Sequence, residues 1–281
     1  MITQISIIFF RKQITIIAFL SLLLASCATL SSADRISQPR GFKKAELRTK
    51  YFTLLAYYRI TKPVDPLNIY IEGDGNAWSN RTHLSNDPTP RNPLALELAV
   101  IDPSPNVAYL ARPGQYLKPQ TAGVKSAYWS DKRFSKEVIT SMNEAVSQLA
   151  QLAKTDKINL IGYSGGAAVA VLIAAQRNDI ISLRTIAGNL DSEAVNKYHK
   201  VSPLSGSFNP INFAQKVKNL PQRHFAGSKD TVIPLFVAES FIRRVGDKDY
   251  SRITVVEGAT HSKGWRSCWK ELLTYPVRQS N

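Results

Sequence analysis

Residues 162–166, with the sequence GYSGG, constrain the fold of this chain more than any other segment, because they place a G-x-S-x-G pattern directly after the apolar run 158–161. The pattern is typical of a sharp turn from a strand into a helix, on which Ser164 is strained and its hydroxyl exposed. Residues 165–175 are apolar on every face, as expected for a helix buried against a sheet. A glycine-rich turn that merely packs tightly is the alternative, and the flanking strand and helix patterns favour an exposed nucleophile.

Strand and helix patterns alternate along the rest of the chain. Short apolar runs bounded by turn residues predict strands at residues 52–60, 67–72, 106–111, 157–161, 181–187, 223–226 and 252–257. Helical spacing of apolar residues predicts helices at 134–153, 165–175 and 234–245. Strands separated by helices imply a mostly parallel sheet in one α/β domain, residues 42–281, with its site at the carboxyl ends of the strands.

Residues 1–26 resemble a lipoprotein signal peptide. Arg11 and Lys12 precede an apolar stretch, residues 14–24, which is shorter than the roughly 20 residues of a membrane span. The sequence LASC that ends at Cys27 resembles the lipobox of bacterial lipoproteins, in which cleavage precedes the cysteine and lipid is attached to it. Cys27 is therefore the expected lipid attachment site, and two or more acyl chains would give stable anchoring. An ordinary signal peptide with an incidental cysteine is the alternative.

The same resemblance implies a location. Ala28 follows Cys27, whereas an aspartate at that position commonly retains Gram-negative lipoproteins at the inner membrane. We expect an exported protein that is lipid-anchored to the bacterial cell envelope, in the outer membrane and facing the periplasm. Residues 27–41 are polar and poor in apolar side chains, which predicts a flexible tether between the lipid and the domain.

Charge and cysteine content limit the classes of partner. Lys and Arg outnumber Asp and Glu by 36 to 21, and the resulting net charge of +15 favours anionic lipid headgroups or acidic polymers. Nucleic acid is discounted, because the basic residues are scattered and the leader directs export. Cys268, the second of two cysteines, lies at helical spacing with Trp265, Trp269 and Leu272, so we expect it to pack rather than react.

A serine nucleophile needs a base, usually histidine, and an acid that orients the base. His261 follows the strand predicted at 252–257 and so lies at its carboxyl end. Asp230 lies in the loop after the preceding strand, between the serine and the histidine in chain order. The less favoured candidates are His83, His199 and His224 as the base and Asp191 and Glu193 as the acid.

With Ser164, Asp230 and His261 in this order and at strand ends, the chain resembles the α/β-hydrolase superfamily over residues 50–275. The resemblance implies the α/β-hydrolase fold, with a mostly parallel central sheet, helices on both faces and a small cap. It also implies an oxyanion hole of two backbone amides. One would belong to Gly165 and the other to Asp74 or Gly75, in a loop that carries Glu72 where many relatives have histidine. A glycine-rich turn, or a metal site at Glu72 and Asp74 that lacks further ligands, is the alternative.

The chemistry implied is that of a serine hydrolase that cleaves a carboxylic ester through an acyl-enzyme, with no cofactor. Residues 189–220 form a long connection with aromatic side chains and predict the cap, and residues 78–93 are expected to line the entrance. An aromatic cap on a basic, lipid-anchored protein favours a lipid, acyl ester or thioester substrate. Two alternatives stay open: an acyltransferase with the same triad, and a non-catalytic hydrolase-fold lipoprotein that binds a ligand or partner.

Overall fold

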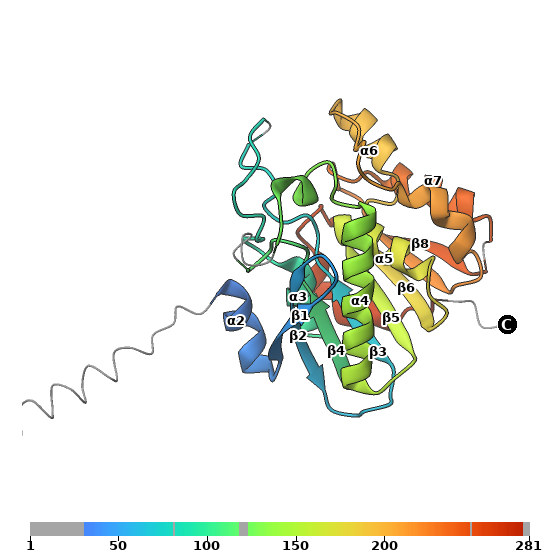
Figure 1. The fold of residues 1–281 in the computed structure, drawn as a ribbon. Helices are drawn as coiled ribbons and strands as arrows, with labels where there is room; N and C mark the ends of the chain where they lie inside the picture. The colour runs from blue at the N-terminus through green and yellow to red at the C-terminus, as the bar shows by residue number, and fades with distance from the viewer. Residues whose placement is uncertain (1–30, 81, 118–122, 248, 278–281) are drawn as a thin grey trace, which may run out of the picture. The chain divides into compact units, whose positions relative to one another are not determined.

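A sheet of eight strands runs through the part of the chain that is described in a computed structural model, residues 31–80, 82–117, 123–247 and 249–277 (Figure 1). The strand order is β1-β2-β4-β3-β5-β6-β7-β8. The strands are β1 (Lys43–Arg48), β2 (Thr53–Ile60), β3 (Leu67–Ile71), β4 (Asn106–Leu110), β5 (Ile158–Tyr163), β6 (Ile180–Ile186), β7 (Gln222–Gly227) and β8 (Ser251–Val256).

The six strands from β4 to β8 in the sheet are parallel, and only β2 pairs antiparallel, with β1 on one side and β4 on the other. The mostly parallel sheet predicted from the sequence is therefore confirmed. Strand β1 was not predicted, because it is an edge strand whose single buried residue is Leu47. An edge strand with one covered side chain has no apolar run for a sequence pattern to detect.

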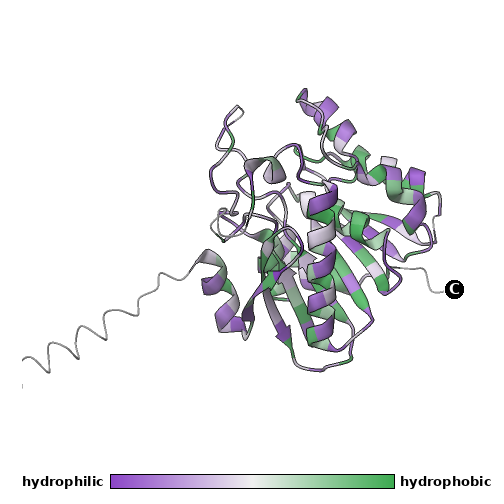
Figure 2. Ribbon diagram, in the orientation of Figure 1, coloured by the Kyte–Doolittle hydropathy of each residue, from purple (hydrophilic) through white to green (hydrophobic). Residues whose placement is uncertain are grey.

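Helices cover both faces of the sheet. Neighbouring residues on a strand point to opposite faces, so Ile69 and Tyr70 on β3 belong to two different apolar clusters. One cluster contains side chains of α4 (Lys136–Ala153), α5 (Gly165–Ala174) and α7 (Leu235–Val245). The other contains side chains of α3 (Leu94–Ala99) and α8 (Trp265–Thr274). Figure 2 shows hydrophobic residues concentrated along the strands and hydrophilic ones on the outward side of α4.

The long connection between β6 and β7 divides into two parts. Its first part carries α6 (Ser192–His199), which stands above the sheet in Figure 1 and exposes Tyr198. Its second part is the 3-10 helix η3 (Pro210–Val217), whose Ala214 and Val217 are buried in the main core. Both parts of the predicted cap, residues 189–220, are therefore anchored in the main core, the first through Leu190 and Val195, although α6 exposes its outer side chains. A shorter 3-10 helix, η2 (Ser126–Trp129), precedes α4.

The flexible tether expected over residues 27–41 needs correction in its second part. Residues 32–40 form α2 (Ser32–Ser37) and the 3-10 helix η1 (Gln38–Arg40). Ala33 and Asp34 are buried, and the hydroxyl of Tyr57 on β2 donates a hydrogen bond to Asp34 Oδ1 at 2.7 Å. Ser37 is buried as well, but three buried residues, of which only Ala33 is apolar, are too few to produce a periodic apolar pattern, which is why the sequence did not predict a docked helix.

The expected signal peptide and Cys27 lie outside the described residues. The compact unit that carries the site is Ala33–Asn281. None of the helices in the described part of the chain is both long enough and apolar enough to cross a membrane.

Candidate active site

Ser164 occupies the turn between β5 and α5, with φ 52° and ψ −119°. A positive φ is costly for a residue with a side chain, so this conformation persists only because the surroundings impose it. Glycine is required on both sides of the serine. A Cβ atom at Gly162 would collide with the backbone of Ala167, and one at Gly166 would collide with the carbonyl of Ile71 on β3. The two glycines allow β5, α5 and β3 to approach closely, and the serine is held at their junction.

The structure brings His261 and Asp230 to this serine. His261 Nε2 lies 3.0 Å from Ser164 Oγ, and His261 Nδ1 lies 3.0 Å from Asp230 Oδ2. The Asp230 side chain is fully buried, and its Oδ1 accepts hydrogen bonds from the amides of Val232 and Ile233 at 2.8 and 2.9 Å. If Nδ1–H donates to this carboxylate, Nε2 is left to accept the serine proton.

The other histidines are engaged elsewhere. His224 is buried in β7, where Thr185 Oγ1 lies 2.8 Å from its Nδ1, and burial lowers its pKa to about 3. His199 Nε2 lies 2.7 Å from the carbonyl oxygen of Val232, which ties α6 to the loop that carries Asp230. His83 lies in an exposed loop beside Asn80.

Of the less favoured acids, one is engaged elsewhere and the other is exposed. Asp191 caps α6, since its Oδ1 accepts a hydrogen bond from the amide of Ala194 at 3.2 Å, and Glu193 is exposed. Cys268 is half-buried and packs against the apolar cluster around α8, as expected, and burial raises its pKa.

The loop after β3 lies directly against the serine. Gly73 faces the side chains of Tyr163 and Ser164, and its carbonyl accepts a hydrogen bond from Gln115 Nε2 at 3.0 Å. Within the described residues, the amides of Asp74 and Gly75 donate to no acceptor. Gly165 is the first residue of α5, where the amides of the first turn lack intrahelical partners. Free amides on both sides of the serine are the donors that an oxyanion hole requires.

The carboxylate of Asp74 is held by two arginines. Arg112 Nη1 lies 3.3 Å from its Oδ1, and Arg133 Nη1 lies 3.3 Å from its Oδ2. Neither arginine was predicted as a site residue. Arg112 comes two residues after β4 and thus shares the strand-end position of the other candidates, whereas nothing in the sequence distinguishes Arg133.

Glu72, directly after β3, lines the same cleft as Asp74 but is engaged by different groups. It is 1% exposed, and its Oε1 accepts a hydrogen bond from the amide of Gly73 at 2.9 Å. Burial raises its pKa to about 7, although hydrogen bonds from the amides of Gly73, Ala95 and Leu96 oppose this shift. No group of three potential metal ligands occurs among the described residues, and Glu72 and Asp74 face different partners.

Ser164, His261 and Asp74 line a cleft of about 430 Å³. Val232 and Ser262 lie in the same cleft with the histidine, and Asn92 and Pro90 come from the loop between β3 and α3 that was expected to line the entrance. A volume of this size suits a small organic ligand.

Several solved structures share this fold. An esterase of Pyrococcus furiosus matches with a TM-score of 0.59 at 18% identity, over 84% of this chain and 91% of that chain. An alpha-beta serine hydrolase homologue from Coxiella burnetii matches with a TM-score of 0.59 at 16% identity, over 82% and 95%. An acylaminoacyl peptidase of Pyrococcus horikoshii matches with a TM-score of 0.60 at 11% identity, over 93% of this chain and 44% of that chain. No protein-family model matches the sequence, and no curated protein matches it. The chain therefore has the α/β-hydrolase fold, as predicted.

Proposed function

We propose that the protein is a serine hydrolase that cleaves a carboxylic ester, with Ser164 as nucleophile, His261 as general base and Asp230 as the residue that orients the base. The observation that carries this proposal is the continuous set of contacts from Ser164 Oγ through the imidazole to a buried carboxylate, each at 3.0 Å. A ligand-binding protein has no need for a strained serine, an oriented imidazole and a buried acid together.

The reaction follows from the geometry. His261 Nε2 accepts the proton of Ser164 as Oγ attacks the ester carbonyl, and the amides of Gly165 and of Asp74 or Gly75 stabilise the oxyanion. The tetrahedral intermediate breaks its bond to the leaving alcohol, which takes the proton from His261. Water then attacks the acyl-enzyme with His261 as base, and the acid is released as Ser164 regains its proton. One oxyanion donor typically contributes about 3 to 4 kcal/mol to transition-state stabilisation.

The kind of acyl bond is part of the proposal. Structures with this fold include an esterase and a peptidase. We favour an ester, because the exposed aromatic residues Trp78, Tyr198 and Phe208 occur in the cap and in the loop expected to line the entrance, and such surfaces suit an acyl chain.

We also propose that the protein acts at a membrane, exported and lipid-anchored through Cys27 to the outer membrane and facing the periplasm. The motif that supports this lies in the sequence alone. Replacing Cys27 with serine removes the thiol that would carry the lipid, so Cys27→Ser should release the protein from the membrane fraction and prevent its labelling by radioactive palmitate. Retention and labelling of the variant would contradict the proposal.

The catalytic proposal is tested on a soluble fragment that begins at residue 28. A fluorophosphonate probe should give one covalent adduct, located at Ser164 by mass spectrometry, and p-nitrophenyl esters of graded chain length should be hydrolysed with a burst. Ser164→Ala should abolish both, whereas Ser267→Ala, which changes an exposed serine on α8, should abolish neither. A folded protein that gives no adduct and no turnover would overturn the proposal and favour a ligand-binding lipoprotein.

Adding an alcohol as a second acceptor beside water in the same assay tests the acyltransferase alternative. Transfer of the acyl group to the alcohol faster than to water would assign the protein to that class, with the same three residues in the same roles.

A further inference from the structure

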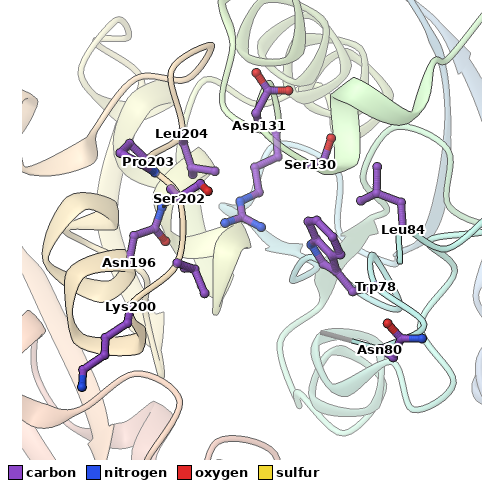
Figure 3. A pocket seen from close by; sticks show the side chains of 12 residues that line it. Trp78, Asn80, Leu84, Ser130, Asp131, Asn196, Lys200, Ser202, Pro203 and Leu204 are labelled. Atoms are coloured by element: carbon purple, nitrogen blue, oxygen red, sulfur yellow. Dashed lines mark hydrogen bonds between the residues drawn. The ribbon is translucent and has the colours of Figure 1, made fainter. Parts of the chain in front are cut away.

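A second cavity, of about 720 Å³, lies beside the catalytic cleft. Figure 3 shows its two walls. Trp78 and Leu84 come from the loop after β3, and Pro203 and Leu204 come from the cap segment after α6. The walls are largely apolar, and the volume falls within the range of small-molecule binding sites.

Arg133 connects this cavity to the nucleophile. Its side chain lines the cavity, and its Nη1 lies 3.3 Å from Oδ2 of Asp74, which lines the catalytic cleft. Asp74 in turn lies against Gly165, because a Cβ atom at Gly165 would collide with the Asp74 carboxylate. The Arg133–Asp74 ion pair therefore has one member in the lining of each cavity.

Arg133 has donors that its known partner does not use. A guanidinium carries five N–H donors, and Asp74 is shared with Arg112. The Nε of Arg133 is buried and has no hydrogen-bond partner among the described residues, while the side chain keeps 14% of its surface exposed. An arginine that shares one carboxylate and faces an apolar cavity is suited to bind a second carboxylate.

The two other charged residues of the lining point elsewhere. In Figure 3 the ammonium group of Lys200 points away from Trp78, and the carboxylate of Asp131 lies at the edge opposite Asn80. Asp131 also lies close to Gly206, since its Oδ2 would be 3.1 Å from a Cβ atom there. Of the three charged residues in the lining, Arg133 is the one that pairs with a residue of the catalytic cleft, Asp74.

The position of His261 indicates whether the acyl part or the leaving group of an ester would extend toward this cavity. The leaving group takes its proton from His261 Nε2 and must therefore lie on the histidine side of the cleft, with Val232 and Ser262. None of these three residues lines the second cavity. The acyl part is the one that extends toward Arg133.

We propose that this cavity binds the acyl part of the substrate and that Arg133 pairs with a carboxylate at its far end, so that the substrate class is the monoester of an aliphatic dicarboxylic acid. This inference rests on the proposed ester hydrolase activity. The apolar walls take the methylene chain, and Arg133 distinguishes the charged acyl group from a neutral one of the same length.

The test compares two esters with six-carbon acyl groups, mono-p-nitrophenyl adipate and p-nitrophenyl hexanoate, with the full-length chain purified in detergent. The wild type should have the higher kcat/KM for the adipate. Arg133→Gln should lower the ratio of the two kcat/KM values by about 10- to 100-fold, the effect of losing a hydrogen bond between charged groups. Arg133→Lys should retain part of the preference, and Lys132→Gln, which removes an exposed neighbouring charge outside the cavity, should retain all of it.

Equal losses on both esters in Arg133→Gln would overturn the inference, because they would mean that Arg133 only holds Asp74 in place. A wild type that prefers the hexanoate would also overturn it. If neither ester is hydrolysed by folded protein, the proposed function fails, and calorimetry with monomethyl adipate and Ser164→Ala protein still decides the inference. Binding that Arg133→Gln abolishes would support the carboxylate site, and absence of binding would overturn it.

Discussion

The carboxylate of Asp74 lies against Gly165, the residue that follows the candidate nucleophile, so closely that Gly165 has no room for a side chain. The contact joins the two segments from which the oxyanion donors would come. Because Asp74 is also held by Arg112 and Arg133, the loop after β3 is fixed relative to the serine by charge as well as by close packing.

Gly165→Ala should therefore lower kcat by about 10²- to 10³-fold, the loss expected when one oxyanion donor is misplaced. The added methyl group would push Asp74 and its amide away from the serine. The double variant Gly165→Ala/Asp74→Ala lacks the colliding carboxylate oxygens. Its loss of kcat, expressed as a free energy, should therefore be smaller than the sum of the losses in the two single variants. Full activity in Gly165→Ala, measured with p-nitrophenyl hexanoate, would mean that the donors lie elsewhere.

Asp230→Asn should reduce kcat by roughly three to four orders of magnitude while leaving the fold intact. Asparagine keeps the acceptor for the amides of Val232 and Ile233, but it does not hold the imidazole of His261 in the required tautomer. The control is Asp191→Asn, which alters the competing acid at the start of α6. Asp191→Asn should leave kcat unchanged. If instead Asp191→Asn lowered kcat and Asp230→Asn did not, Asp191 would be the residue that orients His261.

The elements around the serine could be predicted because each has a strong local pattern. The predicted strand at 157–161 and helix at 165–175 correspond to β5 and α5, and the end of β3 was predicted to within one residue. Local patterns fail at β1, where one face is exposed at the edge of the sheet, and at α2, where only a few residues are buried.

The residues of the candidate site likewise differ in whether a local sequence pattern predicts them. Ser164, Asp230 and His261 could be selected because each follows a recognisable strand and because parallel strands bring their carboxyl ends together. Arg133 could not be selected, since its contact with Asp74 depends on how the segment before α4 folds back over the sheet. A pairing between residues distant in sequence leaves no periodic signal, and an arginine in a loop is most often a solvated one.

Glu72→Gln should remove a pH dependence of stability. The pKa of Glu72 is raised from its ordinary value of 4.5 to about 7, so between these values the folded protein holds a proton that the unfolded chain has released. Stability from this group is therefore present below pH 4.5 and is lost as the pH rises to about 7. The loss is on the order of 3 kcal/mol, since each pKa unit corresponds to about 1.4 kcal/mol.

The measurement is the free energy of urea unfolding of both proteins across this pH range. Glutamine keeps an acceptor for the amide of Gly73 but does not titrate. The free energy of unfolding of the variant should therefore rise relative to that of the wild type as the pH rises. The comparison cancels the other titrating groups that the two proteins share. Parallel curves would show that Glu72 does not titrate in this range.

Residues 32–40 should contribute to stability. The carboxylate of Asp34 is buried and accepts a hydrogen bond from Tyr57 at 2.7 Å, and Lys44 Nζ lies 3.2 Å from its second oxygen. A fragment that begins at residue 42 loses these contacts and the buried side chain of Ala33. Its free energy of unfolding should be lower than that of a fragment from residue 28 by about 1 to 3 kcal/mol, because a buried polar group loses its partner.

Point substitutions separate this effect from truncation itself. Asp34→Ala in the longer fragment should reproduce most of the loss, whereas Glu46→Ala, at an exposed position of β1, should change stability by no more than about 0.5 kcal/mol. Urea unfolding followed by tryptophan fluorescence measures the two fragments and the two point variants. Equal stability of the fragments from residues 28 and 42 would show that α2 adds nothing to the domain, and the whole of residues 27–41 would then act as the tether that their composition predicts.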